Sequence, residues 1–244
     1  LACAVTAVVQ DAGRSADHAL VGDGPEAPAV GAGPWDEAQA KDLLAAMGIR
    51  TPARWLCRDR ATAHAALDEL GAPVVVKVCD AAILHKSDVG GVHVGVADHV
   101  GLDSALDTLA ALGPQPALVE RMAPAGVDLV VGAHRDPVFG PVVVCGVGGT
   151  ATEVYADVAI AAVPATFEQL IALPDQLIAG SLLDGFRGQP AVDRIALAGV
   201  ARSLGNLLLA NDHLTDVEIN PLRATADGLL ALDAVLVAGK DHQP

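Results

Sequence analysis

A hairpin near the C-terminus is the feature that most constrains the fold of this chain. Polar and apolar side chains alternate along residues 216–222, and a second extended run, residues 229–237, follows a turn around residues 227–228. Side chains of a strand repeat every second residue, so Glu218 and Asn220 are predicted to lie on one face. The hairpin therefore predicts a sheet near the end of the chain.

The oxygen-bearing side chains of this hairpin indicate a metal site. Glu218, Asn220 and Asp233 supply two carboxylates and an amide oxygen, which are the hard ligands that Mg²⁺ prefers, usually together with substrate phosphates. We interpret the hairpin as the metal end of an ATP site. Its phosphate end would then be formed by the lysine, histidine and glycine motifs upstream.

The composition limits both the core and the partners. Of the 244 residues, 52% are hydrophobic but only 2% are aromatic, so the core must be built from Ala, Val and Leu, which suits helices packed on sheets. The formal net charge of −15 argues against nucleic acid as a partner, because its phosphates need a basic surface. An anionic substrate must instead be held by a few local cations.

Nothing in the sequence predicts a membrane protein. The longest apolar stretches are broken by Gly, Pro or Asp157 before about 20 residues, and no secretion signal opens the chain. The four cysteines have no CxxC spacing, so reduced thiols and a cytoplasmic location are expected. Residues 1–34, rich in Ala, Gly and Pro, are interpreted as a linker or the remnant of a preceding domain.

Hydrophobic periodicity and turn residues predict helix-flanked, mainly antiparallel sheets in two lobes. The predicted helices cover residues 37–47, 61–70, 98–112, 167–173 and 192–209, and the predicted strands cover residues 74–78, 92–96, 117–120, 128–133, 142–144, 215–220 and 229–237.

Lys77 stands inside a run of valines, residues 74–78. A lysine there is unfavourable unless its ammonium reaches water or an anion. Two interpretations stay open from the position alone: a lysine at a sheet edge that extends to solvent, or a phosphate-binding lysine.

The loop at residues 85–91 follows Lys77 and ends in Gly90-Gly91. Glycines let backbone N–H groups approach an anion closely, and His85 and Lys86 add positive charge. His85 is either an ordinary surface histidine or a phosphate carrier, because a neutral imidazole can attack a phosphoryl group.

A third loop, residues 145–150, carries Gly146, Gly148 and Gly149 after a strand. It lacks the spacing of a dinucleotide-binding fingerprint, and no GxxxxGK[ST] loop or protein-kinase motif occurs in the chain. The loop is therefore either a packing turn or an exposed backbone that faces phosphates.

In this order and spacing, these motifs resemble those of one family. From about residue 35 to residue 237 the chain resembles the ATP-grasp subunit or domain of ADP-forming (NDP-forming) acyl-CoA synthetases, relatives of the succinyl-CoA synthetase β subunit. The matching stretches are residues 73–77, 83–92, 135–137 with 139–141, 146 with 148–149, 185–188 and 218–222.

The resemblance implies an α+β, two-lobed ATP-grasp fold. Its N-terminal lobe would span residues 35–118, and its C-terminal lobe, residues 119–240, would carry the Mg/ATP site. Residues 120–122 would form the hinge that recognises adenine, and Asp128 stands where the family usually has a Glu near the nucleotide. The nucleotide-binding residues that the resemblance implies are Lys77, Glu120, Met122, Asp128, Arg135, Gly146, Gly148 and Gly149.

The resemblance also implies metal ligands and catalytic residues. Asn220 and Asp233 would ligate Mg²⁺, with Glu218 as a further ligand or as the partner of a phosphohistidine. His85 matches a loop histidine proposed as a second phosphate carrier.

The implied reaction interconverts acyl-CoA, ADP and phosphate with a carboxylic acid, CoA and ATP. CoA and the primary phosphohistidine would be supplied by an α-type subunit or a fused domain. Two alternatives are an ATP-grasp ligase for another carboxylic acid and a non-catalytic, ATP-sensing domain of a regulatory acetyltransferase. The intact set of Lys77, His85, Glu218, Asn220 and Asp233 favours catalysis.

Overall fold

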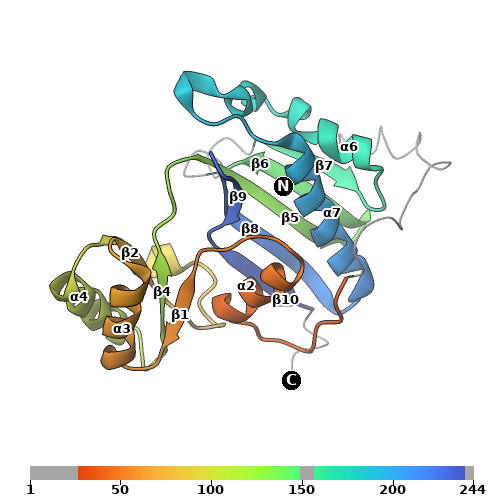
Figure 1. Ribbon diagram of the computed structural model, residues 1–244. Helices are drawn as coiled ribbons and strands as arrows, with labels where there is room; N and C mark the ends of the chain where they lie inside the picture. Colours follow the sequence, from red (N-terminus) through yellow and green to blue (C-terminus); the bar gives the residue numbers. More distant parts are fainter. Residues whose placement is uncertain (1–26, 149–156, 240–244) are drawn as a thin grey trace.

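Two antiparallel sheets form the framework of the protein (Figure 1). The computed structural model describes residues 27–148 and 157–239. The smaller sheet has four strands in the order β1-β4-β2-β3, and the larger has six, with β10-β8-β5-β6-β7 in a row and β9 paired with β8. This two-sheet architecture agrees with the two predicted lobes, while the predicted boundary at residues 118 and 119 stays a prediction.

The smaller sheet is covered by two helices that begin at aspartate caps. Asp59 and Asp98 each accept a hydrogen bond from the backbone N–H three residues further on, which satisfies a free donor of the first turn. Leu67 and Leu102 then turn inward and are buried against the strands. The elements are β1 (Arg54–Cys57), α3 (Arg60–Leu70), β2 (Val74–Val78), the 3₁₀ helix η1 (Lys86–Val89), β3 (Val92–Val96), α4 (His99–Ala110) and β4 (Ala117–Arg121).

The larger sheet holds the main core on one face. Leu129, Val131 and Ala133 point from β5 into this core, which the long helix α7 covers with Leu197 and Leu204 (Figure 1). The remaining elements are β5 (Val127–Asp136), β6 (Gly140–Val147), β7 (Val158–Ala162), α6 (Phe167–Ala172), η2 (Leu173–Gln176), η3 (Gly180–Asp184), η4 (Phe186–Gly188), α7 (Arg194–Ala210), β8 (Leu214–Thr225), β9 (Gly228–Ala231) and β10 (Ala234–Ala238).

Helix α2 (Glu37–Ala46) precedes the smaller sheet in sequence but packs beside the larger one (Figure 1). A capping box between Asp36 and Gln39 fixes its start. Ala40 and Leu44 belong to the core of the larger sheet. The helix therefore brings its first turn to the place where the two sheets meet.

The C-terminal hairpin differs from its prediction in one respect. Residues 229–237 were expected as one strand, but they form β9 and β10 with Leu232 and Asp233 between them. The backbone carbonyl of Leu232 accepts a hydrogen bond from Lys77 Nζ at 2.6 Å, and the carbonyl of Asp233 accepts one from the Asn220 N–H at 3.2 Å. These contacts hold the interruption and turn Asp233 toward the smaller sheet.

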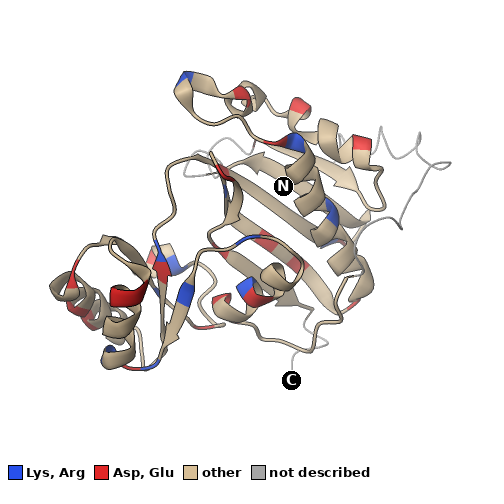
Figure 2. Ribbon diagram, viewed as in Figure 1, with Lys and Arg blue, Asp and Glu red and all other residues tan. Residues whose placement is uncertain are grey.

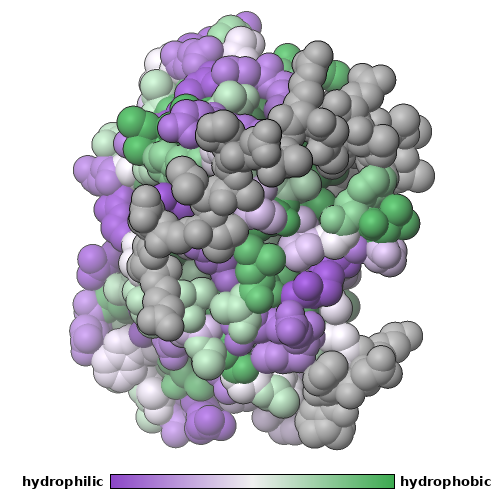
Figure 3. Space-filling view, turned by 90° about the vertical axis from the view of Figure 1, so that its right-hand side faces the viewer, coloured by the Kyte–Doolittle hydropathy of each residue, from purple (hydrophilic) through white to green (hydrophobic). Residues whose placement is uncertain are grey.

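The surface of the protein mixes hydrophobic and hydrophilic residues. On the face in Figure 3, hydrophobic groups are scattered between hydrophilic side chains. In the part of the chain that the structure describes, no helix is long and apolar enough to cross a membrane.

We expect Leu204→Ala to lower the free energy of unfolding by about 2–5 kcal/mol, because it removes a fully buried side chain between α7 and the larger sheet. Urea denaturation would measure the change. Ile195→Ala on the exposed side of the same helix is the matched control, with an expected change within about 0.5 kcal/mol. Equal losses for both variants would contradict the assigned core.

Candidate nucleotide and metal site

A cavity of about 230 Å³ lies between the two sheets and contains five of the residues predicted from sequence. Its walls come from β2 and β4 of the smaller sheet and from β8 and the Leu232–Asp233 interruption of the larger sheet. Arg121, which lies in the predicted hinge, also lines it, as do Arg223 and Ser87, which had no role assigned from sequence. The predicted residues in its wall are Lys77, Glu120, Met122, Asn220 and Asp233.

Lys77 does not extend to solvent from a sheet edge. Its strand β2 lies between β3 and β4, and its side chain is only 7% exposed. The ammonium is 2.6 Å from Glu37 Oε1 and 3.0 Å from Glu120 Oε2, in addition to its hydrogen bond to Leu232. The ammonium thus has three acceptors within 3.0 Å, of which Glu120 and Leu232 line the cavity.

Lys86 connects the η1 turn with the metal end of the site. Its ammonium is 3.0 and 3.1 Å from the two carboxylate oxygens of Asp233 and 3.1 Å from Glu37 Oε2. Lys86 is buried, although its neighbours in the loop are exposed. The loop therefore places a single cation, Lys86, against the larger sheet.

Glu37 and Lys41 of α2 complete this group of charges and were missed in the sequence. Lys41 Nζ is 2.7 Å from Glu37 Oε1 and 2.5 Å from Glu120 Oε1, and both α2 side chains are fully buried. An available signal was the acid–lysine pair four residues apart, which borders Ala40 on the apolar side of the helix. Figure 2 shows the two signs of charge close together on α2.

Three ammonium groups and three carboxylates thus form one ionic cluster, in which all members but the partly exposed Asp233 are buried; it consists of Lys41, Lys77, Lys86, Glu37, Glu120 and Asp233.

Burial and charge shift the pKa values within the ionic cluster. Burial alone would raise the pKa of Glu37, but the ammonium groups of Lys77, Lys41 and Lys86 outweigh it and lower this pKa to about 2. For Asp233, burial and the Glu37 charge outweigh the lysines and raise the pKa. The pKa of Lys41 is lowered by burial and by Lys77, despite its two carboxylate partners.

The oxygen ligands of the hairpin lie as the alternation predicts. Glu218 and Asn220 share a face of β8, where Asn220 Nδ2 donates to Glu218 Oε1 at 3.2 Å. Asn220 and Asp233 line the cavity together. Within the described residues, no group of three or more His, Cys, Asp or Glu side chains could hold a metal ion. One carboxylate and one amide oxygen fit Mg²⁺, which usually takes few protein ligands and completes its shell with phosphates and water.

Other predicted residues lie outside the cavity wall. Asp128 forms a two-point ion pair with Arg223, at 2.6 and 2.8 Å, so it orients an arginine of the wall. Arg135 instead donates to the backbone carbonyls of Leu208 and Leu214 near the end of α7, at 2.7 and 3.2 Å. Its contact with phosphate stays a prediction.

The glycine loop is described only in part, because Gly149 lies outside the described residues. A Cβ on Gly148 would come within 2.8 Å of the Asp128 backbone, and one on Gly146 within 2.8 Å of the Asp157 carbonyl. Close packing therefore requires both glycines, whatever their contact with phosphates. His85 is exposed at the start of η1, next to the buried Lys86.

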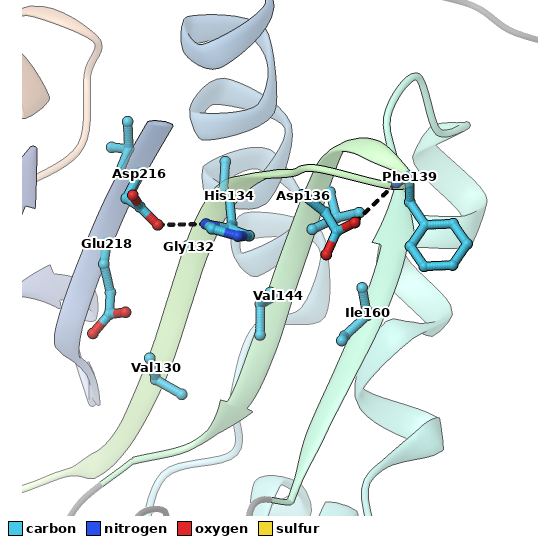
Figure 4. A pocket seen from close by; sticks show the side chains of 12 residues that line it. Val130, Gly132, His134, Asp136, Phe139, Val144, Ile160, Asp216 and Glu218 are labelled. Atoms are coloured by element: carbon cyan, nitrogen blue, oxygen red, sulfur yellow. Dashed lines mark hydrogen bonds and ion pairs between the residues drawn. The ribbon is translucent and has the colours of Figure 1, made fainter. Parts of the chain in front are cut away.

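A second cavity, of about 290 Å³, lies on the face of the larger sheet opposite the core. Figure 4 shows apolar side chains of β5 to β7, such as Val130, Val144 and Ile160, beside the His134–Asp216 ion pair. Glu218 is in the wall of this cavity, whereas Asn220 is in the wall of the first. Strand β8 thus contributes to the walls of both cavities.

The two sheets and the charged cavity between them belong to the part of the chain, residues 26–237, that the ATP-grasp domain family matches. The chain is 33% identical over 212 residues to the β subunit of ADP-forming acetate–CoA ligase I of Pyrococcus furiosus, covering 84% of this chain and 91% of that subunit. It is 30% identical to the ADP-forming acetate–CoA ligase I of Archaeoglobus fulgidus, of which it covers 31%.

Solved structures agree with these relatives. The chain matches Ca. Korarchaeum cryptofilum acetyl-coenzyme A synthetase 1, in complex with coenzyme A, Ca-AMPCP and HgCl⁺, with a TM-score of 0.77 and 30% identity, covering 84% of this chain and 93% of the other. The chain therefore belongs to the ATP-grasp family and is similar to the β subunits of ADP-forming acyl-CoA ligases. The predicted family and fold class are confirmed.

We expect the ionic cluster to make stability sensitive to acid. Because the pKa of Glu37 falls from its ordinary 4.5 to about 2, its ionised form contributes about 3 kcal/mol. This contribution is complete above pH 4.5 and is lost as the pH falls toward 2. Glu37→Gln should therefore reduce the slope of unfolding free energy against pH in this range, measured by urea denaturation at several pH values.

Asp233, whose pKa is raised, contributes with the opposite sign, so the relevant quantity is the change in slope between variant and wild type. Glu69→Gln on the exposed side of α3 is the control and should keep the wild-type slope. An unchanged slope in Glu37→Gln would show that Glu37 does not carry the acid sensitivity.

Proposed function

We propose that this chain carries out the nucleotide half of an ADP-forming acyl-CoA ligase reaction, acyl-CoA + ADP + phosphate ⇌ carboxylic acid + CoA + ATP. The observation that carries the proposal is the cavity between the sheets. Lys77 of the smaller sheet lines it together with Asn220 of β8 and with Leu232 and Asp233 of the interruption, and Lys86 of η1 contacts Asp233. This arrangement supports the proposal, because phosphoryl transfer requires cations and metal ligands around one volume.

The nucleotide would lie along β4 and β2. Lys77 and Lys86 would exchange carboxylate partners for phosphate oxygens, while Met122 and the backbone at the end of β4 contact the base. Arg121 and Arg223, the latter held by Asp128, add two further cations to the wall beside Lys77. The preference for adenine is part of this proposal and rests on the position of residues 120–122 beside the cavity.

Asn220 and Asp233 would hold Mg²⁺, which would neutralise charge on the nucleotide phosphates. Asp233 already presents both carboxylate oxygens at the cavity, where Lys86 contacts them. Glu218 lies next to Asn220 but faces the second cavity. Glu218 therefore suits contact with an incoming phosphoryl donor as well as with the metal.

His85 would act as a relay in this transfer. Its neutral imidazole accepts the phosphoryl group from a phosphohistidine of the partner, so that one N–P bond breaks as another forms. A terminal phosphate oxygen of ADP then attacks this phosphorus, and the imidazole leaves as ATP forms. The exposed position of His85, one residue before Lys86, supports access from the partner and proximity to the phosphate cations.

The CoA and acyl groups would be handled by an α-type subunit or a fused domain, in the cytoplasm. The Pyrococcus furiosus relative is itself named as a β subunit, and this chain covers 91% of it. A Korarchaeum cryptofilum structure with Mg-AMPPCP, at a TM-score of 0.71, has its phosphohistidine segment pointing towards the nucleotide binding site. An equivalent partner segment would meet this chain near Glu218 and His85.

We expect Asp233→Ala to weaken ATP binding about tenfold or more in the presence of Mg²⁺, because it removes the carboxylate ligand. Isothermal titration calorimetry with and without EDTA would measure it. With EDTA the loss should largely disappear, since the carboxylate then has no metal to bind. Asp227→Ala, in the exposed turn before β9, is the matched control. Equal Mg²⁺-dependent binding by Asp233→Ala and wild type would reject the metal assignment.

We expect His85→Asn to lower phosphoryl transfer between the α partner and ADP by about 10²-fold or more, because a covalent relay cannot operate without its nucleophile. Labelled phosphate should appear on His85 of the wild type and be absent from that site in the variant. His64→Asn, on α3, should retain transfer. Full turnover by His85→Asn with the partner would reject the relay while leaving nucleotide binding intact.

A further inference from the structure

Lys41 is buried behind the cavity and does not form part of its wall. Its side chain is 0% exposed, and its ammonium lies 2.7 Å from Glu37 Oε1 and 2.5 Å from Glu120 Oε1. A buried ammonium is strongly unfavourable unless carboxylates compensate it. The position therefore needs an explanation in terms of those two carboxylates.

Both carboxylates also hold the cations of the proposed nucleotide site. Glu37 contacts Lys77 through Oε1 at 2.6 Å and Lys86 through Oε2 at 3.1 Å. Glu120 divides its oxygens, with Oε1 on Lys41 and Oε2 on Lys77. Lys41 is thus connected to Lys77 only through Glu37 and Glu120, which both lysines contact.

We propose that Lys41 is a positioning residue for nucleotide binding, which acts by balancing the charge of Glu37 and Glu120. With Lys41 present, the ionic cluster is neutral, and Lys77 can offer its charge to a phosphate. Without Lys41, the cluster carries one excess negative charge beside the cavity; Glu120 then depends on Lys77, and Glu37 on Lys77 and Lys86. The change would repel phosphate and draw the Lys77 ammonium away from it. This inference rests on the proposed nucleotide function.

A purely structural ion pair between α2 and β4 would behave differently. Loss of that pair would lower stability without a specific effect on the affinity for nucleotide. A positioning role through charge predicts weaker nucleotide binding and its rescue when one acid is neutralised as well. Rescue by a second buried substitution is not expected from a packing defect.

The test compares Lys41→Met, Glu37→Gln/Lys41→Met and wild type by calorimetry with ADP and Mg²⁺, with folding checked by circular dichroism. We expect Lys41→Met to bind about tenfold more weakly or worse. The double variant should bind at least threefold more tightly than Lys41→Met. Asp42→Asn, an exposed charge change on the same helix, should bind like wild type. If Lys41→Met does not fold, Lys41→Gln takes its place, since its amide can still donate to a carboxylate.

Wild-type affinity in Lys41→Met would overturn the positioning role, as would a double variant that binds no better than Lys41→Met. A wild-type chain that does not bind nucleotide would instead reject the proposed function itself. The two failures are therefore distinguishable from one set of titrations.

Discussion

Six charged side chains, five of them buried and Asp233 partly exposed, gather where the two sheets meet, and the geometry of the site depends on their pairing. Transfer of an ion from water into the protein interior costs several kcal/mol, so each ion must find an opposite charge at hydrogen-bond distance. Here the partners come from α2, β2, η1, β4 and the segment between β9 and β10. Segments far apart in sequence are thereby held at one place, with little freedom to shift independently.

The larger sheet supplies the rigid side of this arrangement. On β8, Val217 and Ile219 enter the core, and Glu218 and Asn220 take the opposite face. A slip of one residue would bury the polar pair and expose the apolar one, so the core fixes where the oxygen ligands lie. The interruption at Leu232 and Asp233 then adds a carboxylate that a regular strand would not have turned toward Lys86.

The parts of this site that could be predicted depend on local patterns. Alternation placed Glu218 and Asn220 on one face, and a lysine among valines marked Lys77 as a residue that needs either solvent or an anion. The Glu37–Lys41 spacing was a local signal, but the pairing of Lys41 with Glu120 could not be found this way, because 79 positions separate them and only the packed fold joins them. Likewise, no local pattern shows that Arg135 is used by the carbonyls of Leu208 and Leu214.

The contacts of Lys86 also indicate why such a site should discriminate between a metal–nucleotide complex and a bare anion. In the described state its ammonium is shared by Asp233 and Glu37. A phosphate alone would have to displace these carboxylates and would leave them unpaired, which is unfavourable in a buried site. If a metal ion binds Asp233 while a phosphate binds Lys86, no carboxylate is left unpaired, because each displaced group finds a new partner. The buried balance of charge thus favours binding of the two ligands together.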